Sequence, residues 1–249
     1  MLLDDLAGAA RVLFVHAHPD DETLQTGALI AELTARGVRC DLVTATRGER
    51  GEIVPGPLSG LTGDAFVARR ETELAGAVAA LGITERAYLG EPPARAAGQP
   101  PRRYADSGMR WIREGLAGPS GDAGPDSFTA ADPAEEVADL VAAIEYFRPD
   151  ALISYDDDGS YGHPDHVRVH EISGPAAARA GVPVLWVVSD PAGAGEWSDL
   201  AHRLPTVVAA ARCHASQVSV VESADPRAAE VIHSGGQRTP LATRIGLRR

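Results

Sequence analysis

Two clusters of histidine and acidic residues lie far apart in the sequence and share a local pattern. Residues 16–22 read HAHPDDE, and residues 161–166 read YGHPDH. Imidazole nitrogens and carboxylate oxygens are the ligands that zinc and related divalent ions take in proteins. The residue types therefore predict metal-dependent chemistry.

The spacing inside the first cluster favours a shared ion. His18 and Asp21 are three residues apart, so if Pro19 opens a helix both side chains lie on one side, and Asp20 points elsewhere. One imidazole and one carboxylate from this cluster, with one imidazole from the second, make a set of two histidines and one acid. Three protein ligands leave a position for water, as in a catalytic zinc site.

Each cluster alone also has an ordinary interpretation. A His-Pro pair is common in turns, and acids at a helix start cap it and complement its dipole. The secondary structure predicted around the clusters favours a shared functional site instead. Short apolar runs predict strands at residues 12–15, 38–46, 87–89, 151–155 and 182–188. Helical spacing predicts helices at residues 23–36, 64–81, 133–147 and 163–180, the last interrupted at Gly174 and Pro175.

This alternation predicts an α/β fold: a doubly wound, mostly parallel, Rossmann-like sheet with helices on both faces. Both clusters follow a strand and precede a helix, so they should meet at the carboxyl edge of the sheet, where such folds bind ligands. We expect a single domain over residues 1–249, with a long substrate-side loop at about residues 90–131. Beyond Val218 the pattern predicts little.

Composition narrows the class of protein. The net charge is −12 and all 23 basic residues are arginines without clusters, so nucleic acid is a poor partner. The N-terminus lacks a signal-peptide pattern, and no apolar run is long enough to span a membrane. We expect a cytoplasmic protein in which Cys40 and Cys213 are reduced thiols. The sequence leaves open whether it forms a homo-oligomer.

The two clusters resemble the signature motifs of the LmbE/PIG-L-like zinc N-deacetylases, in order and in approximate separation, over about residues 11–218. The resemblance implies that His18, Asp21 and His166 bind zinc and that Asp20 is the general base. Two histidines and one acid also suit Fe(II) or another divalent ion.

The same resemblance assigns roles in the second cluster. His163 would polarise the amide oxygen, stabilise the oxyanion or protonate the leaving amine. Asp165 would orient a neighbouring imidazole, and Tyr161 would add a hydrogen bond to the oxyanion. A further segment, residues 213–217, also resembles the family, but His214 at a helix end is given no catalytic role.

A narrower similarity, to the deacetylases and amidases of mycothiol metabolism, lies in residues 106–109, which read DSGM. It implies substrate contacts by Arg70, Asp106 and Met109, and places Glu49 and Glu52 at the pocket. Ordinary alternatives stay open: Glu49, Glu52 and Arg70 as solvated or paired charges, and Asp106 as a turn former. The loop after Gly118 resembles no segment of those enzymes.

The expected function is zinc-dependent removal of acetyl from an N-acetylglucosaminyl substrate, such as N-acetylglucosaminyl-inositol or a secondary-metabolite amino sugar. An amidase for mycothiol-type conjugates is the alternative within the same chemistry. A nucleotide-binding protein is disfavoured because the first strand-helix turn is acidic and lacks the Gly-x-Gly-x-x-Gly pattern. A non-catalytic metal- or sugar-binding module would not need Asp20 and His163, and both are present.

Overall fold

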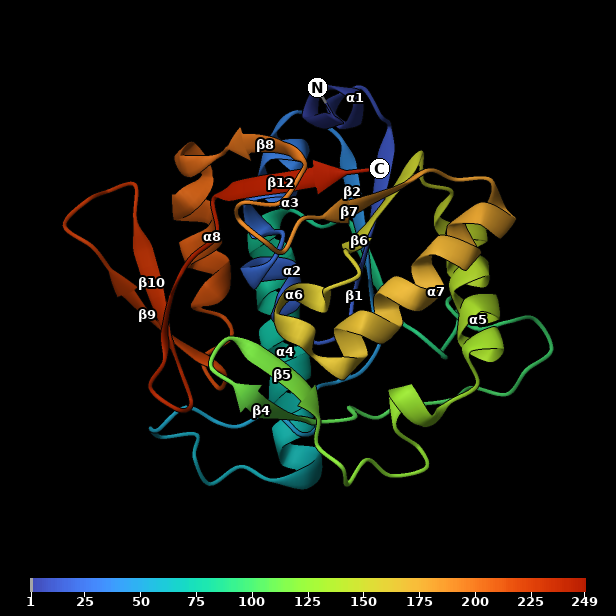
Figure 1. The fold of residues 1–249 in the computed structure, drawn as a ribbon, viewed down its shortest axis with the longest axis horizontal. Coiled ribbons are helices and arrows are strands. Elements are labelled where there is room, and N and C mark those ends of the chain that lie inside the picture. The colour runs from blue at the N-terminus through green and yellow to red at the C-terminus, as the bar shows by residue number, and fades with distance from the viewer. Residues whose placement is uncertain (1) are drawn as a thin grey trace.

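A seven-stranded sheet runs through the protein in the computed structural model, which describes residues 2–249 (Figure 1). Its strands in spatial order are β3 (Glu85–Tyr88), β2 (Arg39–Thr44), β1 (Arg11–His16), β6 (Ala151–Tyr155), β7 (Val184–Val187), β12 (Arg244–Arg248) and β8 (Glu196–Asp199). The strands from β3 to β7 are parallel, whereas β12 is antiparallel to both β7 and β8. The predicted α/β class is confirmed.

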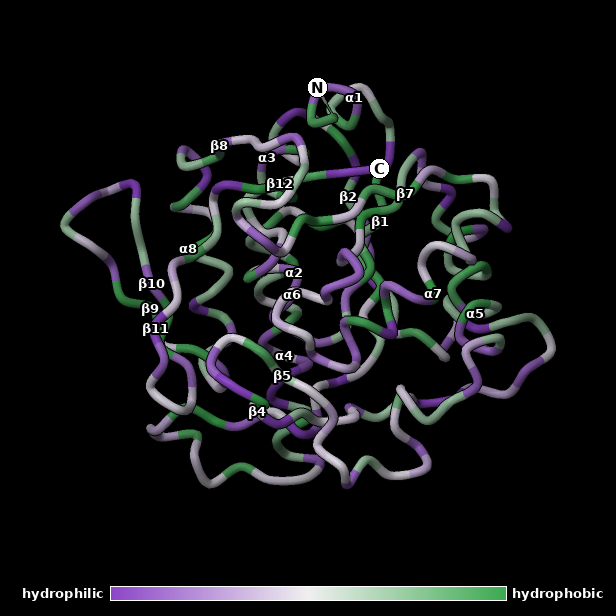
Figure 2. The backbone as a smooth tube through the Cα atoms, viewed as in Figure 1, coloured by the Kyte–Doolittle hydropathy of each residue, from purple (hydrophilic) through white to green (hydrophobic). Residues whose placement is uncertain are grey.

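Helices cover both faces of the sheet. One face packs against α3 (Gly27–Ala35), α4 (Gly63–Leu81) and α8 (Leu204–Ala211), and the other against α5 (Pro133–Phe147) and α7 (Pro164–Ala180). Because side chains alternate along a strand, Leu13 of β1 enters one core and its neighbour Phe14 enters the other. Figure 2 shows the result as hydrophobic stretches along the central strands β1 and β7.

The direction of winding changes between β1 and β6. From β1 the chain passes to β2 and β3 on one side, and later to β6 and β7 on the other. The loops that leave β1 and β6 therefore diverge to opposite faces and open a crevice between them. Both histidine clusters follow these two strands.

Two helix predictions need correction. The helix expected at residues 23–36 is divided into α2 (Asp21–Leu24) and α3, and it begins after Pro19 instead of at it. The interruption expected at Gly174 and Pro175 is wrong, because α7 continues through both residues. Pro175 removes only one backbone donor, and the buried side chains Ile172 and Ala176 hold the helix on the core on either side of it.

The long loop has more structure than its composition predicts. It contains a hairpin of β4 (Met109–Arg113) and β5 (Leu116–Pro119) and the short helix η1 (Phe128–Ala130). Its first part is held against α5, because Arg95 Nη1 and the Tyr104 hydroxyl both donate to the buried Asp139 carboxylate over 2.8 Å. The hairpin lies below α6 (Gly159–Gly162) in Figure 1, and the residues of β4 after Met109 are exposed.

Several further elements were not predicted from the sequence. They are α1 (Leu2–Ala7), η2 (Ala201–Arg203) and a small antiparallel sheet of β9 (Val218–Glu222), β10 (Ala229–His233) and β11 (Arg238–Pro240). Across residues 2–249, no helix combines the length and the apolar character needed to cross a membrane.

Candidate metal centre

The two clusters meet where β1 and β6 end. β1 and β6 are adjacent and parallel, so the segment after His16 and the segment after Tyr155 leave the same edge of the sheet. His18 and Asp21 come from the first segment, and His166 comes from the first turn of α7. The exposed fractions of these three residues are 7%, 5% and 0%, so the cluster lies inside the protein.

One nitrogen each of His18 and His166 and the two carboxylate oxygens of Asp21 form a compact group of donors, called the triangle below after its three residues. His18 Nδ1 is 3.3 Å from Asp21 Oδ2, His166 Nε2 is 3.3 Å from Asp21 Oδ1, and the two imidazole nitrogens are 3.3 Å apart. A tetrahedral ion with zinc-like bond lengths of about 2.0–2.1 Å has ligand atoms about 3.3 Å apart. The spacing of these donors therefore fits a divalent ion, which His18, Asp21 and His166 would hold.

Neighbouring groups fix the orientation of each donor. The His18 backbone N–H donates to Asp21 Oδ2 over 2.8 Å. Asp165 Oδ2 lies 3.2 Å from His18 Nε2 and accepts the Ser107 N–H over 3.0 Å. A carboxylate on the outer nitrogen of a ligand histidine selects its tautomer and raises its basicity. Asp165 thus contacts the imidazole that the sequence expected it to orient.

Tyr155 orients the other imidazole. Its ring stacks on that of His166 at a centroid distance of 4.4 Å and an angle of 9°. The Tyr155 hydroxyl accepts the Ala17 N–H over 2.9 Å. The last residue of β6 therefore links the two segments of the site, a role that the sequence analysis missed because Tyr155 reads as an ordinary strand residue.

Asp20 is held in a strained backbone conformation beside the triangle. Its φ is +121°, a region that costs a residue with a side chain about 1–3 kcal/mol. The Asp20 N–H donates to Glu22 Oε2 over 2.9 Å, and Arg70 Nη2 donates to Asp20 Oδ2 over 2.9 Å. Burial raises the pKa of Asp20 to about 6, against the opposing charge of Arg70. Its carboxylate is thus near the range useful to a general base.

Arg70 lies directly against Asp20. It is 3% exposed, and its guanidinium donates to the carbonyl oxygens of Gly48 and Pro19 as well as to Asp20. Through these contacts Arg70 holds the segment after β1 against the loop after β2. These contacts favour a role for Arg70 in holding Asp20 in place, and its contact with substrate stays a prediction.

His214 and Glu22 form a buried pair beneath Asp20. His214 Nε2 is 2.8 Å from Glu22 Oε1, and both side chains are fully buried. Since Glu22 Oε2 also accepts the Asp20 N–H, the pair supports the strained peptide from below. No catalytic role is predicted for His214 from the sequence, and nothing local marks it as the partner of Glu22, 192 positions away.

His163 is poised as a hydrogen-bond donor. Its Nδ1 accepts the Asp165 N–H over 3.2 Å, as the N-cap of α7, which places the proton of the neutral ring on Nε2. The ring centroid is 4.5 Å from that of His18 and 4.9 Å from that of His166. Burial, followed by the charges of His18 and His166, lowers the pKa of His163 to about 2.

Tyr161 extends the cluster of rings toward the surface. Its ring lies edge-on to His166 and His163, at centroid distances of 5.3 and 6.1 Å. On its other side it meets Trp111 of β4 at 5.6 Å. Sequence analysis did not consider Trp111, because an isolated tryptophan in a loop has no pattern.

The expected substrate-side residues are only partly gathered at the centre. Asp106 Oδ1 is 3.7 Å from His18 Nε2 and accepts the Gly108 N–H, and Glu49 Oε2 accepts the Asp106 N–H over 3.0 Å. Met109 begins β4 close by. Glu52 instead accepts a hydrogen bond from the Ser234 hydroxyl near the small sheet.

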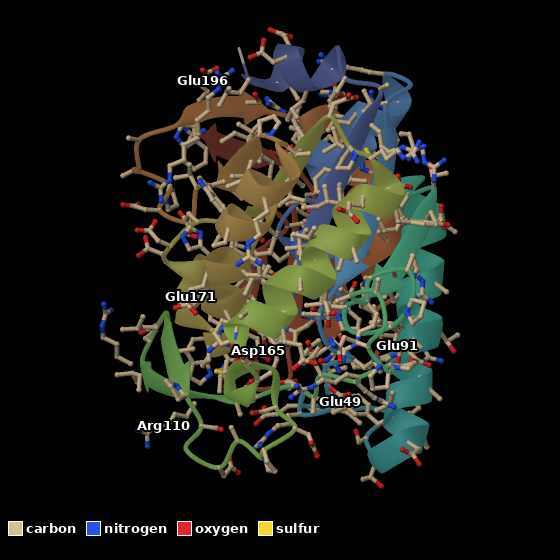
Figure 3. All side chains as sticks on the ribbon, turned by 90° about the vertical axis from the view of Figure 1, so that its right-hand side faces the viewer. Glu49, Glu91, Arg110, Asp165, Glu171 and Glu196 are labelled. Atoms are coloured by element: carbon tan, nitrogen blue, oxygen red, sulfur yellow. The ribbon has the colours of Figure 1, made fainter. Side chains whose placement is uncertain are left out.

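A surface pocket of about 390 Å³ borders the centre without including the triangle. It is lined by Ser107, Pro164, Arg168 and Glu171 and by β5. Figure 3 shows the arrangement from the side: Asp165 lies within the protein, Glu171 lies farther along α7, and Arg110 of the hairpin points outward. The pocket therefore lies beside the centre, and none of the three metal-ligand candidates lines it.

The fold and the triangle together define an α/β protein with a candidate catalytic metal centre at the switch point of its sheet. Residues 13–177 match the PIG-L family, described as GlcNAc-PI de-N-acetylase. The chain belongs to this family, which confirms the resemblance seen in the sequence.

Curated relatives extend this result. The 1D-myo-inositol 2-acetamido-2-deoxy-alpha-D-glucopyranoside deacetylase of Kineococcus radiotolerans is 41% identical over 195 residues, 75% of this chain and 52% of that protein. Deacetylase 1 of the same name from Saccharopolyspora erythraea is 42% identical over 177 residues, 70% of this chain and 55% of that protein. The chain thus spans about half the length of these relatives.

Solved structures agree on the fold. The N,N'-diacetylchitobiose deacetylase of Pyrococcus horikoshii superposes with a TM-score of 0.62 at 19% sequence identity, covering 86% of this chain and 75% of that one. At this identity the likeness concerns the architecture alone.

Proposed function

We propose that the chain is a metal-dependent hydrolase that removes acetyl from an N-acetylglucosaminyl group, with zinc as the ion. The observation that carries the proposal is the close approach of His18, Asp21 and His166, in which each residue has a donor atom 3.3 Å from a donor atom of each of the other two. The names of the relatives supply the substrate class, N-acetylglucosaminyl-inositol. Fe(II) is the alternative ion for the same donors.

The surrounding residues can divide the work of hydrolysis among them. A divalent ion bound here supplies Lewis-acid polarisation and lowers the pKa of water. Asp20 accepts a proton from the attacking water, and this proton is then delivered to the departing amine, so that acetate and a free amine result. His163 Nε2–H and the Tyr161 hydroxyl donate to the amide oxygen as it gains charge. Asp106 and Glu49 are positioned to accept hydrogen bonds from sugar hydroxyls.

Acetate release by the zinc-loaded full chain tests this proposal. We expect release from N-acetylglucosaminyl-inositol that stops when a chelator removes the metal. Asp20→Asn should keep stoichiometric metal and lose about 10²–10⁴-fold in kcat, whereas Asp64→Asn, an exposed acid on α4, should match the parent. An undiminished rate in Asp20→Asn would reject the general-base role. Failure of the metal-loaded parent to release acetate from any glucosaminide would reject deacetylation.

A further inference from the structure

We propose that Trp111 and Tyr161 form an aromatic platform beside the metal centre, and that it binds the apolar face of a second saturated ring attached to the N-acetylglucosaminyl group. The ring class is a polyhydroxylated six-membered ring, either a cyclitol or a further sugar. This inference rests on the proposed deacetylase function and adds a determinant of substrate choice to it.

The rings form a continuous series from the centre to the surface. Tyr161 lies 5.3 Å from His166, measured between centroids, and Trp111 lies 5.6 Å beyond Tyr161 at an interplanar angle of 35°. Trp111 is 49% exposed, so part of its surface rests on Tyr161 while the rest is open to solvent. An amide at the metal centre therefore places its own sugar near Tyr161, and the next ring near Trp111.

The hairpin that carries Trp111 is anchored to the site. Gly162 has φ +81°, and a Cβ there would lie 3.0 Å from Leu116 Cδ1 and 3.1 Å from the Ala117 carbonyl oxygen. β5 thus packs directly on the backbone between Tyr161 and His163. At the start of the hairpin, the Ser107 N–H is bound to Asp165. Trp111 is therefore held at a defined place relative to the reacting group.

The chemistry of this edge suits a hydroxylated ring. The face of an indole carries partial negative charge, and it attracts the slightly positive C–H groups on the apolar face of a saturated ring. Small-molecule sites commonly combine such aromatic surface with a few polar groups. Asp106 and Glu49, at the base of the hairpin, can accept hydrogen bonds from the hydroxyls.

A lipid surface is the competing occupant, since Ile112 is 55% exposed and Arg110 and Arg113 flank the two apolar side chains. Two observations favour the ring. Trp111 leans on Tyr161 toward the centre, and the turn at the tip of the hairpin contains Glu114, an acid that anionic lipids would repel.

The test compares two substrates on the zinc-loaded full chain. The readout is the ratio of kcat/KM for N-acetylglucosaminyl-inositol to kcat/KM for N-acetylglucosamine. Trp111→Ala should lower this ratio about tenfold, and Trp111→Phe should restore it to within about threefold. Ile112→Ala, the adjacent exposed residue of the same hairpin, is the matched control and should keep the parent ratio.

A second measurement separates this proposal from the proposed function. Calorimetry gives the Kd ratio for the reaction products glucosaminyl-inositol and glucosamine without any turnover, and Trp111→Ala should change that ratio to the same extent. If the parent releases no acetate, the proposed deacetylase function is rejected, but the Kd ratio still tests whether the platform binds the second ring. Equal ratios in Trp111→Ala and the parent would overturn it. If Trp111→Ala also no longer co-sediments with anionic phospholipid vesicles that bind the parent, Trp111 contacts lipid instead of the second ring.

Discussion

The metal centre and the β4–β5 hairpin lie next to each other and are built in opposite ways. At the centre, the side chains of Asp21, Asp165 and His166 are buried and bound to groups from three separate segments. In the hairpin, Trp111 and Ile112 are half exposed. The contrast suggests that the chain fixes its reacting groups rigidly and leaves the residues that choose the substrate on an accessible, added element.

The physical basis of the contrast is the cost of burial. A buried carboxylate or imidazole without a partner costs several kcal/mol, so a buried centre requires many bonds that hold it in one arrangement. An exposed hairpin carries no such requirement, and its residues can change with little effect on stability. Three pairs of variants test this contrast.

The largest expected effect comes from making one change in both regions. Ile153 of β6 is fully buried and Ile112 is 55% exposed. Ile153→Ala should lower the free energy of unfolding by about 2–5 kcal/mol, because it leaves a cavity in the core. Ile112→Ala should change it by about 0.5 kcal/mol or less. Urea unfolding measures both, and a similar loss in the two variants would show that the hairpin is part of the stable core.

A somewhat smaller effect is expected from the residue that holds Asp20. Arg70→Met should lower kcat about 100-fold while stoichiometric zinc remains, because Asp20 loses its ion pair and the support of its strained backbone. The adjacent Arg69 is partly exposed and pairs with the buried Glu73 of the same helix, and no contact within residues 2–249 joins it to Asp20, so Arg69→Met is the control. An Arg70→Met enzyme that changes KM alone would instead place Arg70 in contact with the substrate.

The smallest of the three concerns the outer contact of His18. Asp165→Asn should weaken zinc affinity about 10–100-fold, because the imidazole loses the carboxylate that orients it. Competition with a chromophoric chelator measures this affinity. Asp157, an exposed acid between β6 and α6, provides the control, since Asp157→Asn should bind zinc like the parent. Parent-like affinity in Asp165→Asn would show that His18 needs no outer partner.

The sequence predicted the sheet and the meeting of the two clusters for one reason. Residues 151–155 form a continuous apolar run, typical of a buried parallel strand, and residues 133–147 have the apolar spacing of a helix, which Asp132 caps. Once the strands are parallel, clusters at their carboxyl ends must share an edge. No knowledge of distant contacts is needed for this step.

The parts that escaped prediction depend on contacts between distant residues. The hairpin has no clear alternation, because Trp111, Ile112 and the arginines around them lie outside the core. Arg70 binds Asp20, which lies 50 positions away in the sequence. His214 pairs with Glu22, 192 positions away. Nothing local distinguishes such residues from surface charges.

The antiparallel strand β12 has a consequence for how the protein is made. It lies between β7 and β8, although β8 precedes it in the chain. During synthesis β8 therefore emerges from the ribosome before the strand that joins it to the sheet. The nascent chain can form the parallel part around the metal centre first, and β8 has to wait beside it. We expect ribosome-stalled chains ending before Arg244 to leave β8 open to proteolysis while residues 11–187 already resist it.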